Sequence, residues 1–531
     1  MARKIERKLA VFDAETDPFL HGRTPKPFCF GFFDGENFRV FWGADCVEKL
    51  LAFLAEQPPL ILYAHNGGKF DFFFLLQYLG NPVRVINGRI VEARLGRHIL
   101  RDSYAILPIP LAAFAKDEID YSRFESDVRD LHRAEIVNYL RTDCVKLFEL
   151  VKGFRDRFDD HLTIGGCALK KLRELHPVES LNANHDAKYR PFYFGGRVQC
   201  FQRGILPGPW QVFDVNSMYP HVMSGVNHPC GAAYSTFGGK DFFRFVIGRS
   251  RPYFIEFEGL SLGAVPWRDL DTGKLEFPRE ENRYVCTSHE FEAGVQLGLI
   301  SRVKVIAAHV CESTVRFDKY VMQYMADKIR AKEAGDKAAE IFAKLLLNSA
   351  YGKFGQNPEN YRDYFIRRAG EDMPEGDEWR VHTDAESVQI YERDSQRHIY
   401  HDVAIAASIT GASRAMLLRA LHSAQDVIYC DTDSVICRGP GNLEINPTKL
   451  GAWKREASAA EAVIIGRKLY GLFNGDDCVK MATKGFSLGN PKKLFDCWRG
   501  AEILFENPAP NFKLDGTARF TSRRILREYL D

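Results

Sequence analysis

Two aspartates, Asp431 and Asp433, stand one residue apart between the apolar residues 427–430 and 435–437. The β-branched residues on either side predict two strands, and the polar centre predicts the tight turn that joins them. Carboxylates held this close repel each other unless a cation lies beside them. Taken alone, the pattern fits a solvated turn better, and a seat for a divalent cation with oxygen ligands is the alternative. A third carboxylate and a phosphate-binding group elsewhere in the chain would favour the cation.

Asp214 supplies the third carboxylate. It ends a predicted strand that includes residues 212–213, and Pro220 shortly after it favours a first helical turn. An aspartate at a strand end that faces the Asp431–Asp433 turn can hold two Mg²⁺ ions on a nucleoside triphosphate. The alternative at Asp214 is a plain buried turn, which the presence of all three carboxylates disfavours.

A phosphate-binding group lies on a helix predicted at residues 336–351, where Lys344, Asn348 and Tyr351 share one stripe. This stripe offers a cation for the phosphates, an amide for the sugar and a ring for the base, and the lysine can neutralise developing phosphate charge. A surface amphipathic helix would explain Lys344 but not the Asn-Ser-x-Tyr-Gly run that follows it. The nucleotide site is therefore the preferred interpretation.

A second set of carboxylates lies in the first third of the chain. Asp13 and Glu15 share one face at the end of a strand predicted at residues 8–12, and Asp71 follows a buried strand at 60–63. Tyr139 and Asp143 share a face of a predicted helix. Each residue alone could be a helix cap, a solvated helix residue or a polar strand end. Together they supply what two-metal phosphodiester hydrolysis needs, with the tyrosine orienting the water.

The whole chain has the composition of a multidomain globular protein. It has 531 residues, a net charge of +2 and 12 scattered cysteines, which predict reduced thiols in the cytosol and neither a disulfide frame nor a zinc site. No apolar run reaches about 18 residues, so we expect no transmembrane helix, and the N-terminal apolar stretch is too short for a signal peptide. Further strands are predicted at 28–33, 38–42, 253–257 and 303–307, and helices at 47–54, 134–151, 288–297, 317–330 and 403–417. A helix is also predicted to begin near Asp71, and Lys468 and Tyr470 are predicted to share one face of a strand.

The order of these motifs resembles that of the family B DNA polymerases. Asp13-x-Glu15, Asn66…Asp71 and Tyr139-x-x-x-Asp143 resemble the three motifs of a proofreading 3′–5′ exonuclease, apart from one extra residue at the Gly67-Gly68 pair. The segments of Asp214, Lys344 and Asp431–Asp433 resemble polymerase motifs A, B and C, although Glu340 replaces a lysine that some members carry. The chain is identified as a member of the protein-primed subgroup, most like the polymerases of tectivirus-type phages, because of its compact length and two insertions.

The resemblance implies an α+β multidomain fold. A ribonuclease H-like exonuclease domain would be followed by a right-hand polymerase with palm, fingers and thumb. The implied boundaries are 1–157 for the exonuclease domain, 158–223 and 403–490 for the palm, 224–315 for a terminal-protein-binding insertion, 316–355 for the fingers, 356–402 for a strand-displacement insertion, and 491–531 for the thumb. Lysines and arginines from Lys480 to Arg527 make this last part locally basic, as expected of a duplex-holding thumb.

The resemblance also implies residue roles. In the polymerase site Asp214, the Val215 carbonyl and Asp433 would bind two Mg²⁺ ions, which Mn²⁺ could replace, with Asp431 assisting. In the exonuclease site Asp13, Glu15, Asp71 and Asp143 would bind two more, with Tyr139 and Lys116 assisting catalysis. The implied dNTP ligands are Val215, Tyr219, Lys332, Lys344, Asn348 and Tyr351. The implied DNA ligands are Thr16, Tyr63, His65, Asn66, Phe70, Ser103, Tyr104 and Tyr121 for the single-stranded 3′ end, Tyr193, Gly195 and Gly196 for the template, and Thr410, Arg414, Lys468 and Tyr470 for the primer.

The expected partners are primer-template DNA, dNTPs and a terminal protein whose hydroxyl acts as primer. A single-strand-binding protein is a further candidate. We expect a monomer without membrane contact in the cytoplasm, which for a viral protein is that of the host. One rival is a nucleic-acid-primed family B polymerase. Another is a catalytically silent replication scaffold, which the seven carboxylates at two sites argue against.

Overall fold

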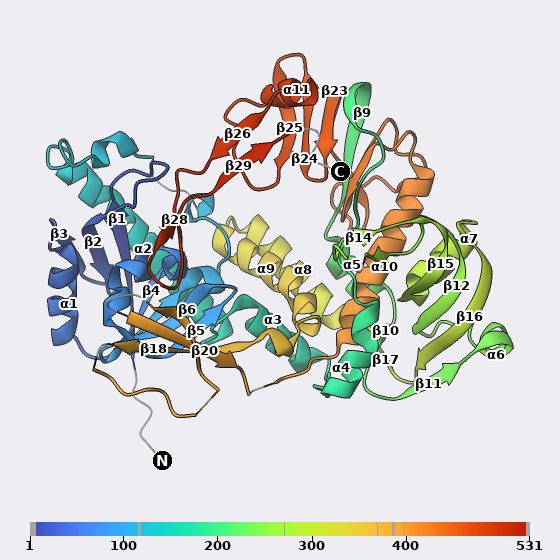
Figure 1. Cartoon of the computed structure of the whole chain (residues 1–531), viewed down its shortest axis with the longest axis horizontal. Helices are drawn as coiled ribbons and strands as arrows, with labels where there is room; N and C mark the ends of the chain where they lie inside the picture. Colours follow the sequence, from blue (N-terminus) through green and yellow to red (C-terminus); the bar gives the residue numbers. More distant parts are fainter. Residues whose placement is uncertain are drawn as a thin grey trace.

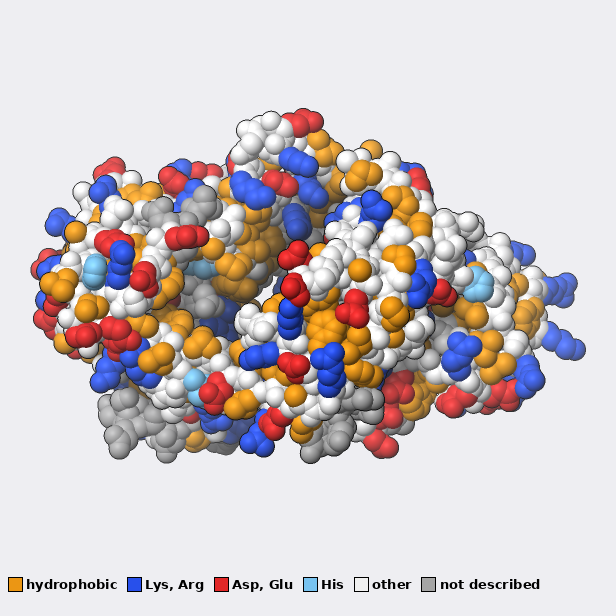
Figure 2. Space-filling view, turned by 90° about the horizontal axis from the view of Figure 1, so that it is seen from above, with side chains coloured by type: hydrophobic (Ala, Val, Ile, Leu, Met, Phe, Trp, Pro, Cys, Tyr) orange, Lys and Arg blue, Asp and Glu red, His pale blue; other side chains and the backbone are white. Residues whose placement is uncertain are grey.

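The computed structural model describes residues 7–114, 118–269, 271–368, 370–376, 378–384, 388–396 and 398–526. The fold is α+β and has several units, as predicted (Figure 1). The N-terminal sheet lies on the left, a four-stranded sheet lies on the right, and the C-terminal strands span the top between them. Two helices, α8 (Asp318–Glu333) and α9 (Lys337–Phe354), lie in the middle. Figure 2 shows a hollow in the surface beside the N-terminal part, with lysine and arginine side chains at its edge.

The N-terminal sheet forms because its strands are apolar on both faces and are covered by helices. Helix α1 (Cys46–Glu56) packs on Ala10 and Phe12, and α2 (Arg133–Phe158) packs on the opposite face against Val11 and Phe28. The strands are β1 (Lys8–Thr16), β2 (Pro27–Phe33), β3 (Phe38–Trp42), β4 (Leu60–Ala64), β5 (Leu79–Ile86), β6 (Arg89–Leu95) and β7 (His98–Asp102). The strands and helices predicted for this part are confirmed, but α2 continues to Phe158, beyond the predicted end at residue 151, and residues 71–78 form a 3-10 helix.

Three strands from the expected second insertion extend this sheet. Strands β18 (Arg362–Arg368), β20 (Val388–Asp394) and β19 (Arg380–Asp384) continue it in the order β19-β20-β18-β5-β6-β7-β4-β1-β2-β3. Asn81 fixes the junction, since its side-chain amide donates to the carbonyl of Ile366 at 2.7 Å and its oxygen accepts from the Ile366 N–H at 3.0 Å. The guanidinium of Arg368 donates to the carbonyls of Tyr78 and Leu79. Residues distant in sequence therefore form one ten-stranded sheet.

A seven-stranded central sheet has the order β25-β24-β23-β9-β22-β21-β8. Its strands are β8 (Val198–Cys200), β9 (Gly204–Val215), β21 (Tyr429–Asp431), β22 (Ser434–Cys437), β23 (Trp453–Gly466), β24 (Leu469–Asn474) and β25 (Asp477–Thr483). Helix α10 (Val403–Ser423) packs behind it, with Leu417 against Phe213 and Val435 in one core. Among the described residues, α10 is the one helix long and apolar enough to cross a membrane, but 89% of its apolar 18-residue stretch is buried in the protein, as expected of a core helix.

The remaining elements frame the central sheet. Helix α9 also packs on α3 (Ile164–Leu175), and Gly335 joins α8 to α9 with a φ of 70°, which favours glycine. The four-stranded sheet consists of β11 (Tyr234–Phe237), β16 (Ile300–Cys311), β12 (Tyr253–Leu262) and β15 (Arg279–Thr287). Other elements are α4 (Ala183–Tyr189), α5 (Met218–Gly225), β10 (His228–Pro229), α6 (Gly239–Phe245), β13 (Trp267–Arg268), β14 (Leu275–Glu276), α7 (Ser288–Gln296), β17 (Thr314–Val315), α11 (Lys493–Trp498), β26 (Ile503–Glu506), β27 (Asn511–Phe512), β28 (Ala518–Arg519) and β29 (Ser522–Ile525).

The C-terminal hairpin of β27 and β28 reaches back to the N-terminal sheet (Figure 1). Phe512 is buried there, stacked on Phe73 with ring centroids 5.2 Å apart, and it also contacts Phe70 and Phe74. Both ends of the chain therefore contribute to one hydrophobic core. All twelve cysteines are free, as predicted.

Candidate active sites

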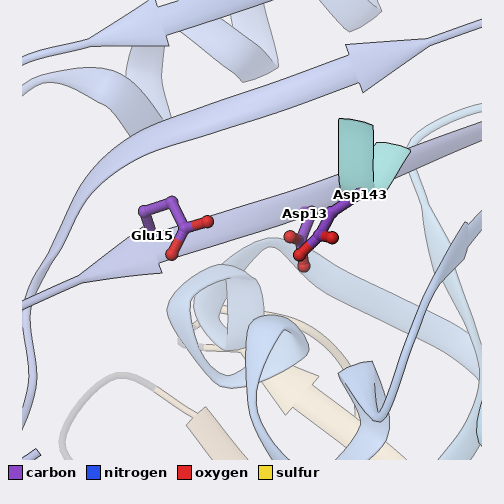
Figure 3. A group of neighbouring side chains, drawn as sticks. All are labelled: Asp13, Glu15 and Asp143. Carbon is purple, nitrogen blue, oxygen red and sulfur yellow. The ribbon is translucent and has the colours of Figure 1, made fainter. Parts of the chain in front are cut away.

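Three of the four predicted N-terminal carboxylates lie together. One carboxylate oxygen from each of Asp13, Glu15 and Asp143 lies within 4.8 Å of the other two. Among the described residues, no other three histidine, cysteine, aspartate or glutamate side chains bring possible metal-binding atoms this close together. Asp13 and Glu15 project from the same face of β1, and Asp143 reaches toward Asp13 from α2 (Figure 3). Hard oxygen ligands at this spacing suit a divalent cation such as Mg²⁺.

Asp71, the fourth member of the N-terminal carboxylate group, is buried beside the other three. Its Oδ1 accepts the N–H of Ala14 at 3.0 Å, between the two acidic residues of β1. Burial and the charge of Asp13 raise the pKa of Asp71 well above its ordinary value. Such repulsion between carboxylates is what a bound cation would relieve.

The predicted tyrosine also lies at this group. Tyr139 is one turn before Asp143 on α2, and its hydroxyl lies 3.1 Å from that of Tyr121. Burial, the Tyr121 hydroxyl and the charge of Asp143 raise the pKa of Tyr139, so it stays protonated at neutral pH. A neutral phenol can orient a water molecule by hydrogen bonding.

The predicted ligands of a single-stranded 3′ end differ in their exposure to solvent. Thr16, Tyr63 and Ser103 are buried, whereas His65, Asn66, Phe70 and Tyr104 are partly exposed and Tyr121 is exposed. His65 Nδ1 lies 2.9 Å from the Ser103 hydroxyl. Sequence reasoning missed Arg89 and Asp102, which carry no local motif. Arg89 binds Asn66 at 2.8 Å and the buried Asp102, and it lies over the ring of Tyr104.

The central carboxylate group, Asp214, Asp431 and Asp433, is assembled by three adjacent strands. Asp214 in β9 pairs with Ser434 in β22, and β22 pairs with β21, which ends at Asp431. The N–H of Val215 donates to the carbonyl of Asp433 at 2.9 Å. The hairpin predicted from the Asp-Thr-Asp sequence is confirmed, and Thr432 at its tip has a φ of 55°.

The charges at this group are unbalanced. Burial and the nearby Asp214 and Asp431 raise the pKa of Asp433 to about 6. Burial and the charge of Glu456 raise the pKa of Asp214. The charge of Lys454, whose Nζ lies 3.5 Å from Asp214, opposes this rise. Glu456 adds to the negative charge that acts on Asp433. The three aspartates offer hard oxygen donors, so the group suits a divalent cation.

Lys468 and Tyr470 approach the same hairpin, although not as predicted. Lys468 does not lie in a strand: it has a φ of 58° and precedes β24, because its N–H donates to the Tyr429 hydroxyl. Its Nζ lies 3.1 Å from Asp431, and Tyr470 packs on Tyr429 with ring centroids 4.8 Å apart. The two residues therefore meet around Asp431 from a turn and a strand.

Helix α9 presents the predicted stripe beside this group. Lys344 and Asn348 are exposed, and Lys332 is exposed near the end of α8. Tyr351 stacks on Tyr219 with centroids 4.1 Å apart and planes 17° apart, which joins α9 to α5. The predicted helices α8 and α9 are confirmed.

Residues 193–196 contact both the turn at Thr432 and the end of α9 at Gly355. A Cβ on Gly196 would lie 2.6 Å from Thr432 Oγ1, and a Cβ on Gly355 would lie 2.5 Å from the Tyr193 hydroxyl, so both glycines permit close contact. Gly195 is exposed. Thr410 and Arg414 are buried in α10 and bind protein groups: Thr410 donates to the carbonyl of Ala407, and Arg414 donates to those of Phe194 and Gly195.

Comparison with known proteins decides the family. Residues 111–434 match the family described as DNA polymerase type B, organellar and viral. The chain is 42% identical to the DNA-directed DNA polymerase of Enterobacteria phage PRD1, over 98% of each chain. The chain belongs to the family B DNA polymerases.

The family B polymerases of other phages are also similar. The chain is 26% identical to the DNA polymerase of Bacillus phage phi29, over 88% of this chain and 87% of that one. A structure of the phi29 enzyme complexed with primer-template DNA and incoming nucleotides covers 98% of this chain and 100% of its own, with a TM-score of 0.76 and 19% identity. The predicted family, the protein-primed subgroup and the fold class are therefore confirmed, and the protein is a DNA-directed DNA polymerase.

Sequence reasoning missed two charged groups near the central site of this polymerase. Glu456 lies between Lys454 at 3.0 Å and Lys480 at 2.6 Å. Lys328 in α8 has a lowered pKa, chiefly because of burial and then because of Lys344. Neither belongs to a short motif, so only the pairing of distant strands and helices could reveal them. The predicted Lys116 and Arg527 lie outside the described residues.

Proposed function

We propose that this polymerase synthesises DNA at the central carboxylate group and proofreads at the N-terminal carboxylate group. The observation that carries this proposal is the presence of two separate clusters of carboxylates in one family B chain. In synthesis the primer 3′-hydroxyl attacks the α-phosphate of the dNTP, a new P–O bond forms, and pyrophosphate leaves. In proofreading a water molecule attacks the last phosphodiester bond of a single-stranded 3′ end.

The carboxylates would hold two divalent cations at each site, in the first place Mg²⁺. The ligands for synthesis would be Asp214, Asp433 and the Val215 carbonyl. Asp431 would assist without binding a cation directly, because its carboxylate is paired with Lys468 Nζ at 3.1 Å. Asp13, Glu15, Asp71 and Asp143 would be the ligands for hydrolysis. When bound, such cations lower the pKa of the attacking hydroxyl or water and neutralise charge on the leaving oxygen.

Side chains around the central group would position the dNTP. Lys344 and Lys332 would offset the charge of the triphosphate, and Asn348 and Tyr351 would contact the sugar and base. Tyr219 would lie under the sugar. Because its ring is stacked on Tyr351 at 4.1 Å, Tyr219 cannot readily move aside, which would exclude a 2′-hydroxyl.

The DNA strands would be held by the predicted groups around the two sites. Tyr193, Gly195 and Gly196 would contact the template, and Lys468 and Tyr470 would contact the primer end. Thr410 and Arg414 are buried, so their effect on the primer would be indirect. In the N-terminal site Tyr139 would orient the water, Lys116 would assist, and His65, Asn66, Phe70, Tyr104 and Tyr121 would hold the unpaired strand, with Thr16, Tyr63 and Ser103 behind them.

The two insertions would serve replication from a terminal protein. Residues 224–315 would bind this protein, whose hydroxyl replaces the primer 3′-hydroxyl in the first transfer. Residues 356–402 would help to displace the non-template strand, since a cavity of about 1540 Å³ lies between β5 and Arg362, Trp379 and Arg393. The palm, fingers and thumb would have the boundaries given above, and the protein would act as a monomer in the host cytoplasm, with a single-strand-binding protein as a further candidate partner.

Two variants test the division of labour. Asp433→Ala should abolish primer extension with Mg²⁺ and spare hydrolysis of single-stranded DNA. Asp13→Ala combined with Asp71→Ala should abolish hydrolysis of single-stranded DNA, leave primer extension intact and raise the error rate of synthesis. Loss of both activities in either folded variant would contradict the two-site proposal.

A separate experiment tests protein priming. Incubation with a candidate terminal protein and one dNTP should give a covalent protein–nucleotide product. Extension of nucleic-acid primers alone would favour the rival mode of priming.

A further inference from the structure

A buried ion pair joins the first insertion to the helix behind the central sheet. Arg414 Nε in α10 donates to Glu290 Oε1 in α7 at 2.7 Å, and their side chains are only 3% and 1% exposed. Removing two charges from water is unfavourable unless their hydrogen bonds are well satisfied. A pair this deeply buried must therefore be held in one geometry by its surroundings.

Glu290 is fixed on the insertion side. Its Oε2 accepts the N–H of Thr287 at 3.1 Å, which belongs to the capping box of α7, and it also accepts the Thr287 hydroxyl at 2.8 Å. This end of α7 lies directly on α10 at Gly411. A Cβ on Gly411 would lie 2.2 Å from Thr287 Oγ1 and 2.9 Å from Glu290 Oε2, so only glycine permits this approach.

Arg414 is fixed on the side of the central site. Its Nη1 donates to the carbonyls of Phe194 and Gly195 at 2.6 and 2.7 Å. The next residue, Gly196, contacts Thr432, and the Thr432 N–H donates to the carbonyl of Arg197 at 2.7 Å. Thr432 is the residue between Asp431 and Asp433. An unbroken series of contacts thus runs from Glu290 to the catalytic turn.

We propose that Glu290 is a positioning residue for DNA synthesis. Its carboxylate compensates the charge of Arg414 and orients the guanidinium, and the guanidinium fixes residues 194–196 against the turn that carries the two aspartates. Without the carboxylate, Arg414 would hold a buried charge with no anion, and its Nη2 already has no hydrogen-bond partner among the described residues. The guanidinium would then turn away from the two carbonyls. The proposal rests on synthesis at the central carboxylate group, which the Asp433→Ala variant tests separately.

The test compares three variants of the full-length protein with a matched control. Glu290→Ala removes the carboxylate, Glu290→Gln keeps an acceptor without the charge, and Gly411→Ala displaces α7 without altering any charge. Glu292→Ala is the control, because Glu292 lies in the same helix but accepts a hydrogen bond from Tyr253 within the insertion. Single-nucleotide incorporation, hydrolysis of single-stranded DNA and thermal unfolding would be measured for each protein.

Glu290→Ala and Gly411→Ala should lower kcat for incorporation roughly tenfold or more, since displacement of reacting groups by about 1 Å can slow a reaction by 10²-fold. Glu290→Gln should show a smaller loss, and KM for the dNTP should change less than kcat because the proposed dNTP ligands lie on other elements, β9, α5, α8 and α9. Hydrolysis of single strands should stay within twofold, as should both activities of Glu292→Ala. Wild-type kcat for both Glu290 variants, or equal loss of synthesis and hydrolysis, would overturn the proposal.

Discussion

At the scale of single residues, Asp433 has a carboxyl whose charge is unfavourable in the metal-free protein. Its pKa of about 6 lies above the ordinary aspartate value of 3.8. A carboxyl whose pKa is raised in the folded state binds its proton more tightly there, so it favours folding below about pH 4 and loses this effect as pH rises through 6. The difference corresponds to on the order of 2–3 kcal/mol at neutral pH.

We therefore expect Asp433→Asn to raise the melting temperature by a few degrees at pH 7.5 in the presence of EDTA. The same substitution should have little effect at pH 4.5, where Asp433 is already largely protonated. Mg²⁺ should raise the melting temperature of the wild type at pH 7.5 more than that of the variant. A variant that melts below the wild type in EDTA at pH 7.5 would refute this account of the charge.

Gly196 provides a second test at this scale. Gly196→Ala should reduce nucleotide incorporation by at least tenfold, because the added methyl would lie 2.6 Å from Thr432 Oγ1 and displace the turn. Gly195→Ala is the matched control, since nothing lies within 4 Å of a Cβ at Gly195. Single-turnover incorporation by both variants gives the comparison. Equal rates for the two would show that the turn tolerates the shift.

The sequence predicted residues in short motifs much better than residues that act from a distance. Asp13, Asp214 and Asp431 are ambiguous one by one, and they stand out because each lies in a short motif and the motifs occur together in one chain. Glu456 and Lys328 do not, because their positions depend on how β23 and α8 pack. Functional residues that lie in one short motif can be recognised from a single sequence. Charged residues that only the tertiary structure brings together cannot.

At the scale of elements, α8 supplies a lysine that the motif on α9 lacks. Lys328 and Lys332 are one turn apart on α8, and burial and the charge of Lys344 lower the pKa of Lys328. Glu340 in α9 opposes this shift. A lysine whose positive charge is destabilised in this way would bind a triphosphate favourably, because the anion relieves the repulsion.

Lys328→Ala should raise KM for dNTPs about tenfold and lower kcat less, since it removes a contact made before the chemical step. Lys319→Ala, at the exposed start of the same helix, should leave both constants unchanged. Steady-state incorporation over a range of dNTP concentrations separates the two parameters. An unchanged KM for Lys328→Ala would exclude the residue from the phosphate site.

The periodicity of apolar residues predicted most helices and strands. It failed where contacts between distant residues determine the backbone conformation. Helices α1, α7 and α9 and strands β2 and β3 follow from their apolar patterns. Lys468 was expected in a strand, but the hydrogen bond to Tyr429 places it in a turn with positive φ. No local pattern indicated that β18 would pair with β5, because the paired residues Val83 and Tyr364 are more than 280 positions apart and neither segment alone carries a signal of the other.

At the scale of the whole molecule, the C-terminal hairpin and the N-terminal sheet share a core. Phe512→Ala should lower the free energy of unfolding by about 3–5 kcal/mol, the usual effect of removing a buried phenylalanine side chain. It should also alter the balance between synthesis and proofreading, because the hairpin would no longer be held against Phe70 and Phe73.

Thermal unfolding and the ratio of incorporation to excision on a mismatched primer would measure both effects. Leu504→Ala is the control, since Leu504 lies in the neighbouring strand β26 and is 53% exposed. If Phe512→Ala were no less stable than Leu504→Ala, the shared core would contribute little.

The ten-stranded sheet has a consequence for how the chain is made. Strand β5 pairs on one side with β6, which follows it directly, and on the other with β18, which begins at Arg362. Every chain is translated from its N-terminus, so β5 presents an open edge to solvent while more than 270 further residues are added. Pro82 lies within that edge, and a proline there limits pairing with a neighbouring nascent chain. The polymerase thus begins folding with its first sheet unfinished, and the ribosome must deliver residues 362–394 before that sheet can close.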